Sequence, residues 1–310
     1  MRTLLFIIIM VLAAAAPAFA QTIAITGGKV YPVSGPPITN GTVLIKDGII
    51  VEIGDHVNVP AGAQRIDARG KIVTPGFINS LTEVGVIEIG QVRDTNDAAA
   101  RGTNYVAASF RVWDGLNPSS ALFAPTRNEG VTTVIVTPRG GLISGQAAAI
   151  DLGAGHASDV LRSGPVAMIA QMSSAAAAGT TARGELIGKL RALLDDVKYY
   201  ASHRGDYDRA QTRTLSAANT DLEALIPVLD GRMPLIIDAD SMAEIDSALA
   251  LARDYKLKIM ISGGAEAWLT ADRLAAANVP VLTGAMNNIP GSFATLTSGR
   301  RMLRCYVAPE

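Results

Sequence analysis

From residue 75 onward, short apolar runs alternate with amphipathic stretches. The apolar runs are residues 132–137, 166–171, 234–239, 258–262 and 280–283, and the stretches with helical character are residues 185–204, 219–230, 241–255 and 270–277. Within 241–255, the apolar residues at helical spacing are Ile245, Ala248, Leu249, Ala252 and Tyr255. This spacing predicts one apolar helix face against a sheet. The alternation favours a parallel α/β architecture, and by itself it fits a barrel or an open sheet.

Before residue 75 the pattern is different. Short runs of β-forming residues occur at 23–25, 29–32, 42–46, 49–53 and 65–68. Asn40-Gly41 and Asp47-Gly48 lie between them, and glycine tolerates the positive φ that tight hairpin turns require. We therefore expect a small antiparallel sheet in this part of the chain.

The first 20 residues have the pattern of a secretory signal peptide. Arg2 precedes an apolar run over residues 4–16, and the small residues Ala18 and Ala20 flank Phe19. We expect cleavage before Gln21 and an exported protein, periplasmic or secreted. The run is shorter than the roughly 20 residues that span a bilayer, and no later run is long enough, so we expect no membrane span after cleavage.

Composition narrows the class of protein further. The chain has 310 residues, 49% of them hydrophobic, which is enough for one large core or two modest ones. Its net charge is -1, and it has no basic stripe to neutralise phosphates, so nucleic acid is not expected as a partner. Cys305 is the single cysteine, so an internal disulfide is excluded.

Four segments carry a family resemblance. They are VYPVSGPPITNGTVLIKDGIIVEIG, GKIVTPGFINSLTEVG, WDGLNPSSALFAPTRNEGVTTVIVTPRGGLISGQAAAIDL and PLIIDADSMAEIDSALALARDYKLKIMISGGAEAWLTADRLAAANVPVLTG. They resemble the amidohydrolase superfamily, specifically the periplasmic branch similar to imidazolonepropionase-like proteins, and the likeness covers about residues 23–284. It implies an α/β fold, a (β/α)8-type TIM barrel preceded by a small β-sandwich-like domain. Any active site would lie at the C-terminal face of the barrel strands.

The resemblance also sets the expected domain boundaries. We expect a signal peptide at residues 1–20, the N-terminal β-domain at 21–73, the barrel at 74–290 and an irregular tail at 291–310. The family continues through an eighth strand that carries an aspartate, whereas this chain ends in LTSGRRMLRCYVAPE. We therefore expect a truncated barrel, incomplete at its C-terminus.

The positions that the resemblance assigns to metal ligands hold other residues here. The His-x-His pair after the first strand is replaced by Leu81 and Glu83, and the histidines after strands five and six are replaced by Asp238 and Gly263. Leucine has no lone pair for a metal, glycine has no side chain, and the carboxylates offer oxygen where imidazole nitrogen is expected. The histidine-based metal motif is therefore degenerate.

The chain has only three histidines, His56, His156 and His203, and none falls at a ligand position of the family. We interpret them as surface or capping groups. The alternative metal ligands are Glu83 and Asp238, with Asp240 nearby, because oxygen-only sites hold hard ions such as calcium or magnesium. The competing interpretation is that these carboxylates are solvated or paired in salt bridges.

Two function classes follow. By resemblance the chain is a hydrolase of non-peptide or dipeptide C–N bonds that uses metal-activated water on a small amide or cyclic-amide substrate, with a divalent metal such as zinc. The missing histidines predict that this activity is impaired. The alternative is a pseudoenzyme, a non-catalytic exported barrel that binds a small ligand or a partner. The residues themselves identify no catalytic group and no cofactor.

Overall fold

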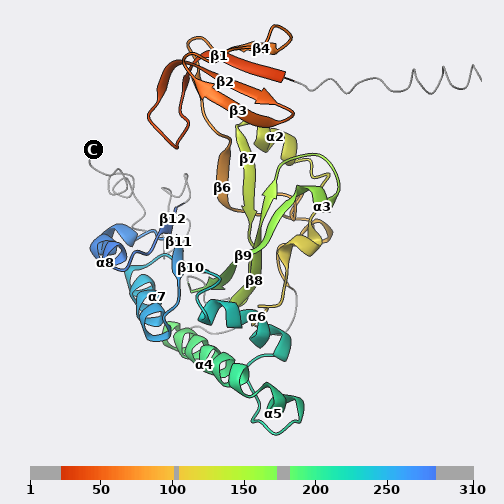
Figure 1. Ribbon diagram of the computed structural model, residues 1–310. Coiled ribbons are helices and arrows are strands. Elements are labelled where there is room, and N and C mark those ends of the chain that lie inside the picture. Colours follow the sequence, from red (N-terminus) through yellow and green to blue (C-terminus); the bar gives the residue numbers. More distant parts are fainter. Residues whose placement is uncertain (1–21, 101–104, 173–181, 284–310) are drawn as a thin grey trace, which may run out of the picture. The chain divides into compact units, whose positions relative to one another are not determined.

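The computed structural model describes residues 22–100, 105–172 and 182–283 (Figure 1). The chain divides into two compact units, Met1–Gly76 and Phe77–Glu310. The predicted signal peptide, the predicted tail and Cys305 lie outside the described residues. Among the helices described, none combines the length and apolar character needed to cross a membrane.

The N-terminal unit contains a five-stranded sheet. Its strands are β1 (Thr22–Val30), β2 (Ile38–Lys46), β3 (Ile49–Gly54), β4 (Gln64–Asp67) and β5 (Ile72–Val73). The order is β3-β2-β1-β4, with β5 also paired to β1. The prediction of an antiparallel sheet is wrong in one respect, because β1 runs parallel to β4 and β5. The described residues of this unit form this one sheet, without a second sheet packed on it.

The two predicted turns have different outcomes. Asp47 and Gly48 connect β2 to β3 with φ values of 52° and 78°, which confirms a tight hairpin turn. Asn40 and Gly41 instead lie inside β2, where Gly41 faces Gly28 at a shift of register between β1 and β2. A bulge accommodates the positive φ of Asn40, so the expected turn there is wrong.

The second unit contains a seven-stranded, barrel-like sheet. Its strands, in spatial as well as chain order, are β6 (Phe77–Thr82), β7 (Val131–Val136), β8 (Ile143–Asp151), β9 (Leu161–Gln171), β10 (Leu235–Ala239), β11 (Ile259–Gly263) and β12 (Val281–Leu282). Leu81 of β6 and Leu282 of β12 pack against the same interior cluster, so the two edges curve towards each other. The expected parallel pattern holds except for β8, which is antiparallel to both β7 and β9.

Helices cover the outer face of this sheet (Figure 1). The α-helices are α2 (Phe123–Asn128), α3 (Ala157–Val160), α4 (Arg183–Ser202), α5 (Arg204–Asp208), α6 (Asn219–Leu229), α7 (Met242–Tyr255) and α8 (Ala271–Ala276), and the 3-10 turns are η1 (Arg93–Thr95), η2 (Val112–Gly115) and η4 (Ala267–Thr270). The long predicted helices are therefore confirmed to within two residues. The segment from β6 to α2 covers the outer face of β7 and β8 through a second core around Trp113 and Phe123.

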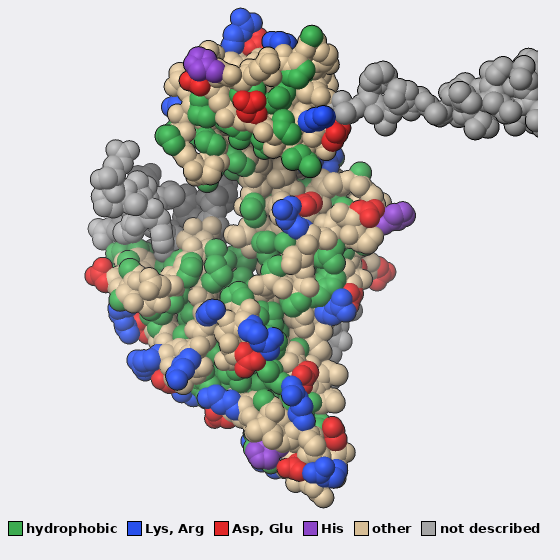
Figure 2. Space-filling model, viewed as in Figure 1, with side chains coloured by type: hydrophobic (Ala, Val, Ile, Leu, Met, Phe, Trp, Pro, Cys, Tyr) green, Lys and Arg blue, Asp and Glu red, His purple; other side chains and the backbone are tan. Residues whose placement is uncertain are grey.

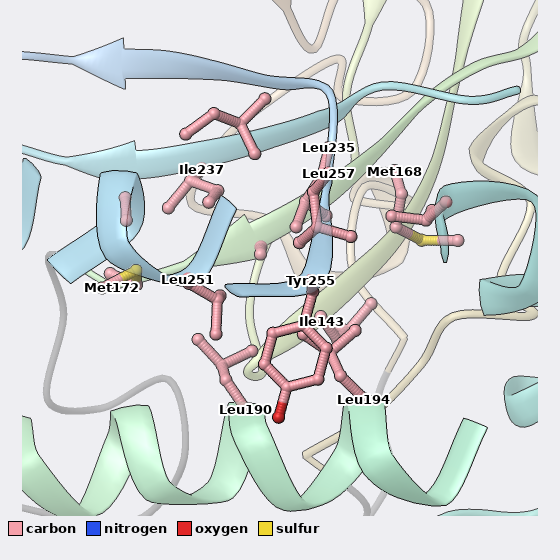
Figure 3. Close-up of a cluster of buried hydrophobic side chains, with 14 of the residues drawn as sticks. Ile143, Met168, Met172, Leu190, Leu194, Leu235, Ile237, Leu251, Tyr255 and Leu257 are labelled. Carbon is pink, nitrogen blue, oxygen red and sulfur yellow. The ribbon is translucent and has the colours of Figure 1, made fainter. Parts of the chain in front are cut away.

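The main core lies between the sheet and α4, α6 and α7. Figure 3 shows Leu190 and Leu194 of α4 facing side chains of α7 and of the strands. Helix α7 begins after Ser241, whose side chain accepts a hydrogen bond from the Glu244 amide at 3.4 Å. Its buried stripe includes Leu251 where the sequence analysis named Leu249, which is partly buried.

Candidate functional site

A cavity of about 310 Å³ opens at the C-terminal ends of the parallel strands of the second unit. Its walls come from β6, β9, β10 and β11 and from the segments that follow β6 and β7. The lining residues are Leu81, Thr82, Glu83, Thr137, Pro138, Arg139, Ile169, Gln171, Ile236, Asp238 and Ser262. This is the face of a barrel on which the family resemblance places an active site.

Strand alternation explains the layout of this cavity. Side chains two residues apart point to the same face, so Ile169 and Gln171 of β9 face inward together, as do Ile236 and Asp238 of β10. Ile169 and Ile236 belong to a buried apolar cluster against which Leu81 packs. The register places Asp238 opposite Gln171 on one side and Ser262 on the other. The cavity therefore has an apolar floor and a polar rim.

On the β6 and β7 side of the rim, Glu83 pairs with Arg139. The Glu83 Oε1 atom lies 3.1 Å from Arg139 Nε, and the two side chains are 35% and 47% exposed. Burial raises the pKa of Glu83, and the positive charge of Arg139 offsets part of that increase. Glu83 is thus a salt-bridged carboxylate, which is the competing interpretation of the sequence analysis.

On the opposite side, Asp238 and Asp240 converge on Gly263. Gly263 has φ +85°, and a Cβ atom added to it would lie 2.6 Å from Asp240 Oδ1 and 3.3 Å from Asp238 Oδ1. Asp240 is not among the lining residues. Burial, followed by the neighbouring charge of Asp238, raises the pKa of Asp240 from 3.8 to about 6. A histidine at position 263 would therefore be strained at this φ and would require Asp240 to shift.

The residues present do not fit the metal that the resemblance implies. A catalytic zinc site takes three protein ligands of histidine, cysteine or carboxylate type. Leu81 offers no donor, Glu83 is paired with Arg139, and Gly263 has no side chain. In the part of the chain that the structure describes, no group of three or more His, Cys, Asp or Glu residues is arranged to hold a metal ion.

None of the three histidines is among the residues that line the cavity. His56 is 94% exposed beside Asp55, and His156 is exposed at the start of α3. His203 ends α4 with its ring stacked on Tyr199 at 4.2 Å between centroids. Figure 2 shows histidine side chains at the molecular surface. Their interpretation as surface or capping groups agrees with these positions.

The structure brings together two of the predicted candidates, Glu83 and Asp238, in one cavity. Arg139 and Gln171 were not predicted as site residues from the sequence. Both occupy the same kind of place as Asp238, because Gln171 ends β9 and Arg139 follows β7 by three residues. Applying the strand-end criterion to every predicted strand would have found them.

Comparisons with known proteins find likeness in sequence over short segments and likeness in fold. No protein-family model matches the chain. Curated relatives include a 5-methylthioadenosine/S-adenosylhomocysteine deaminase of Symbiobacterium thermophilum, 44% identical over 19% of this chain and 15% of the relative. A dihydroorotase of Citrifermentans bemidjiense is 46% identical over 18% of this chain and 13% of the relative. The matched segments thus span less than a fifth of each of these relatives.

Among solved structures, an amidohydrolase from Thermotoga maritima superposes with a TM-score of 0.80 at 21% sequence identity. The match covers 91% of this chain and 75% of that one. Likeness at this level of identity establishes the fold, including the barrel-like arrangement of the seven strands.

Proposed function

We propose that this chain is a (β/α)8-type barrel protein of the amidohydrolase superfamily whose cavity binds a small amide or cyclic amide, and likeness in fold and in short sequence segments supports this. The proposal extends to the unit before the barrel, whose single described sheet would be one layer of a small β-sandwich-like domain. It also holds that the metal-dependent C–N hydrolysis of the family is impaired in this chain. The named relatives, a deaminase and a dihydroorotase among them, support the ligand class.

One observation carries this proposal: the cavity at the strand ends holds a guanidinium, a carboxamide and carboxylates above an apolar floor. An amide needs a donor for its carbonyl oxygen and an acceptor for its N–H group. Arg139 is a donor, Asp238 is an acceptor, and Gln171 is both. The ring carbons of a cyclic amide fit against Leu81, Ile169 and Ile236. Small ligands are held in this way, by a few polar groups set in an apolar cavity.

Impairment is proposed because the ligand positions have lost their nitrogen donors. Leu81 and Gly263 provide no metal-binding side chain, and the side chains next to a metal site cannot replace its direct ligands. Arg139 places positive charge beside Glu83, where a cation would otherwise sit. Binding without turnover is the function that this arrangement supports best.

The second candidate is an active hydrolase of non-peptide or dipeptide C–N bonds with a rebuilt site. The observation that favours it is the presence of Glu83 and Asp238 in one cavity. A weak oxygen-ligated ion would use these two carboxylates. The ion pair between Glu83 and Arg139 argues against it.

The experiment compares binding, turnover and metal content in the purified protein. We expect cyclic amides such as hydantoin and 2-pyrrolidinone to perturb the NMR signals of the cavity residues, with no turnover and with zinc far below one equivalent after dialysis. The matched variants are Glu83→Gln in the cavity and Glu129→Gln, an exposed glutamate after α2. Near-stoichiometric zinc, or turnover that Glu83→Gln abolishes and Glu129→Gln retains, would establish the hydrolase instead.

Export is a further part of the proposal, supported by the signal-peptide pattern of residues 1–20. N-terminal sequencing of protein from its native host is expected to begin at Gln21. Most molecules retaining Met1 would contradict export through cleavage.

A further inference from the structure

We propose that Arg139 is the specificity-determining residue of this cavity and holds the carbonyl oxygen of a neutral ligand where related proteins would use a metal ion. The inference rests on the proposed function and adds the atom that the ligand must present. The metal ligands that the resemblance expects are absent, and the guanidinium of Arg139 lies beside Glu83, at one of their positions.

The backbone fixes Arg139 at the rim. The Thr137 amide donates to the Thr82 carbonyl at 2.9 Å, and the Arg139 amide donates to the Ala98 carbonyl at 2.8 Å. Pro138 lies between them with its φ restricted by the ring. The start of the Arg139 side chain is thus anchored to β6 and to the segment that follows it. An anchored side chain loses less conformational freedom when it binds a ligand.

Glu83 orients the guanidinium without using all of its donors. Arginine carries five N–H donors in a rigid planar fork, and the contact with Glu83 Oε1 is made through Nε. The two terminal amino groups carry the other four donors. Because 47% of the side chain is exposed, a ligand in the cavity can reach it. Among the described residues that line the cavity, Arg139 is the only lysine or arginine.

The charged side chains that line the cavity decide whether a neutral or an anionic ligand oxygen is favoured. Glu83 and Asp238 bring two carboxylates to the lining against the single guanidinium of Arg139. An anionic ligand would lie close to these two acidic side chains and be disfavoured by them, whereas a neutral carbonyl would not. The apolar floor of Leu81, Ile169 and Ile236 strengthens a hydrogen bond from a charged donor, because the local dielectric constant is lower than in water. A neutral amide carbonyl is therefore the expected partner.

The test uses 2-pyrrolidinone labelled with carbon-13 at its carbonyl, and butyrate as the anionic comparison. On the wild type we expect 2-pyrrolidinone to bind more tightly than butyrate, and its carbonyl stretch to shift to lower frequency in isotope-edited infrared spectra. Arg139→Met is expected to weaken binding by about tenfold or more and to abolish the shift, since a hydrogen bond to a charged group is lost. Arg139→Lys should retain part of both effects.

Lys189→Met is the matched control, because Lys189 of α4 lines a separate cavity with Tyr105 and Leu193. It is expected to bind 2-pyrrolidinone like the wild type. Equal binding by Arg139→Met and the wild type would overturn the role of Arg139 and leave the proposed function intact. Binding to the wild type without a carbonyl shift would overturn that role without depending on any variant. No binding of cyclic amides to the wild type would overturn both.

Discussion

On the two sides of the cavity rim, the neighbouring charge shifts the pKa of a carboxylate in opposite directions. On the β6 and β7 side, the increase in the pKa of Glu83 caused by burial is offset by Arg139. On the β10 and β11 side, the increase in the pKa of Asp240 is reinforced by Asp238. The same fold position, the end of a parallel strand, can therefore host a balanced pair or a repelling pair. Burial is the larger cause of the raised pKa on both sides, and the neighbouring charge decides whether that increase is offset or reinforced.

The largest effect on stability is expected for Gly263→His, on the side of the rim that holds Asp238 and Asp240. This substitution introduces the histidine that the family resemblance expects there. The new Cβ atom would clash with Asp240 Oδ1, and a side chain at φ +85° is strained. We expect a loss of about 2–4 kcal/mol in the free energy of unfolding, from backbone strain and overpacking together. Urea denaturation measures it.

Gly188→His provides the control for this substitution. Gly188 lies within α4, and a Cβ atom added there meets no heavy atom within 4 Å. Because glycine is an unfavourable helix residue, this change should leave stability unaltered or slightly raised. If Gly263→His were as stable as the wild type, the packing described around Gly263 would be wrong.

A smaller effect concerns pH on the same side. Because the pKa of Asp240 is about 6 in the folded protein against 3.8 as its ordinary value, the folded state binds the proton more tightly. Stability should therefore fall as pH rises from about 4 to about 6 and level off above that range. We expect the contribution of Asp240 to be about 1–2 kcal/mol after solvent screening.

The difference between the wild type and Asp240→Asn isolates this contribution from those of other carboxylates. Their unfolding free energies, measured from pH 4 to pH 7, should diverge through the window, with the variant gaining relative to the wild type. Parallel curves would show that Asp240 keeps an ordinary pKa in the folded protein.

The smallest effect is expected on the balanced side. Glu83→Gln removes an ion pair whose partners are 35% and 47% exposed. Pairs of this kind contribute about 0–1 kcal/mol, so the free energy of unfolding should change by no more than that. A loss of unfolding free energy comparable to that of Gly263→His would show that the two sides of the rim do not differ in this way.

Much of the fold was predictable from periodicity. The helices α4, α6 and α7 carry apolar residues at helical spacing, and their bounds were expected within two residues. The reversal of β8 was not predictable, since an apolar run contains no information about strand direction. The parallel pairing of β1 with β4 was also not predictable. Turn residues indicate how neighbouring strands are connected, and they do not indicate which distant strands pair.

The site was predictable only in part. Glu83 and Asp238 could be placed together because the strand-end criterion brings distant residues to one face. The pairing of Glu83 with Arg139 could not, because no spacing rule connects residues 56 positions apart that follow different strands. The close approach of Gly263 to Asp240 also depends on the backbone conformation of Gly263. The sequence shows only that a glycine is present, which tolerates a positive φ.

The reversed strand β8 has a practical consequence for handling this protein. Since β8 returns from the rim, the connection from Asp151 to Leu161 lies at the opposite end of the sheet from Arg139. Gly153 and Ala154 in this connection are a site for a fluorophore or an affinity tag that leaves the cavity open. A protein immobilised through that connection presents its binding face to the solution, which suits surface-based screening of amide libraries.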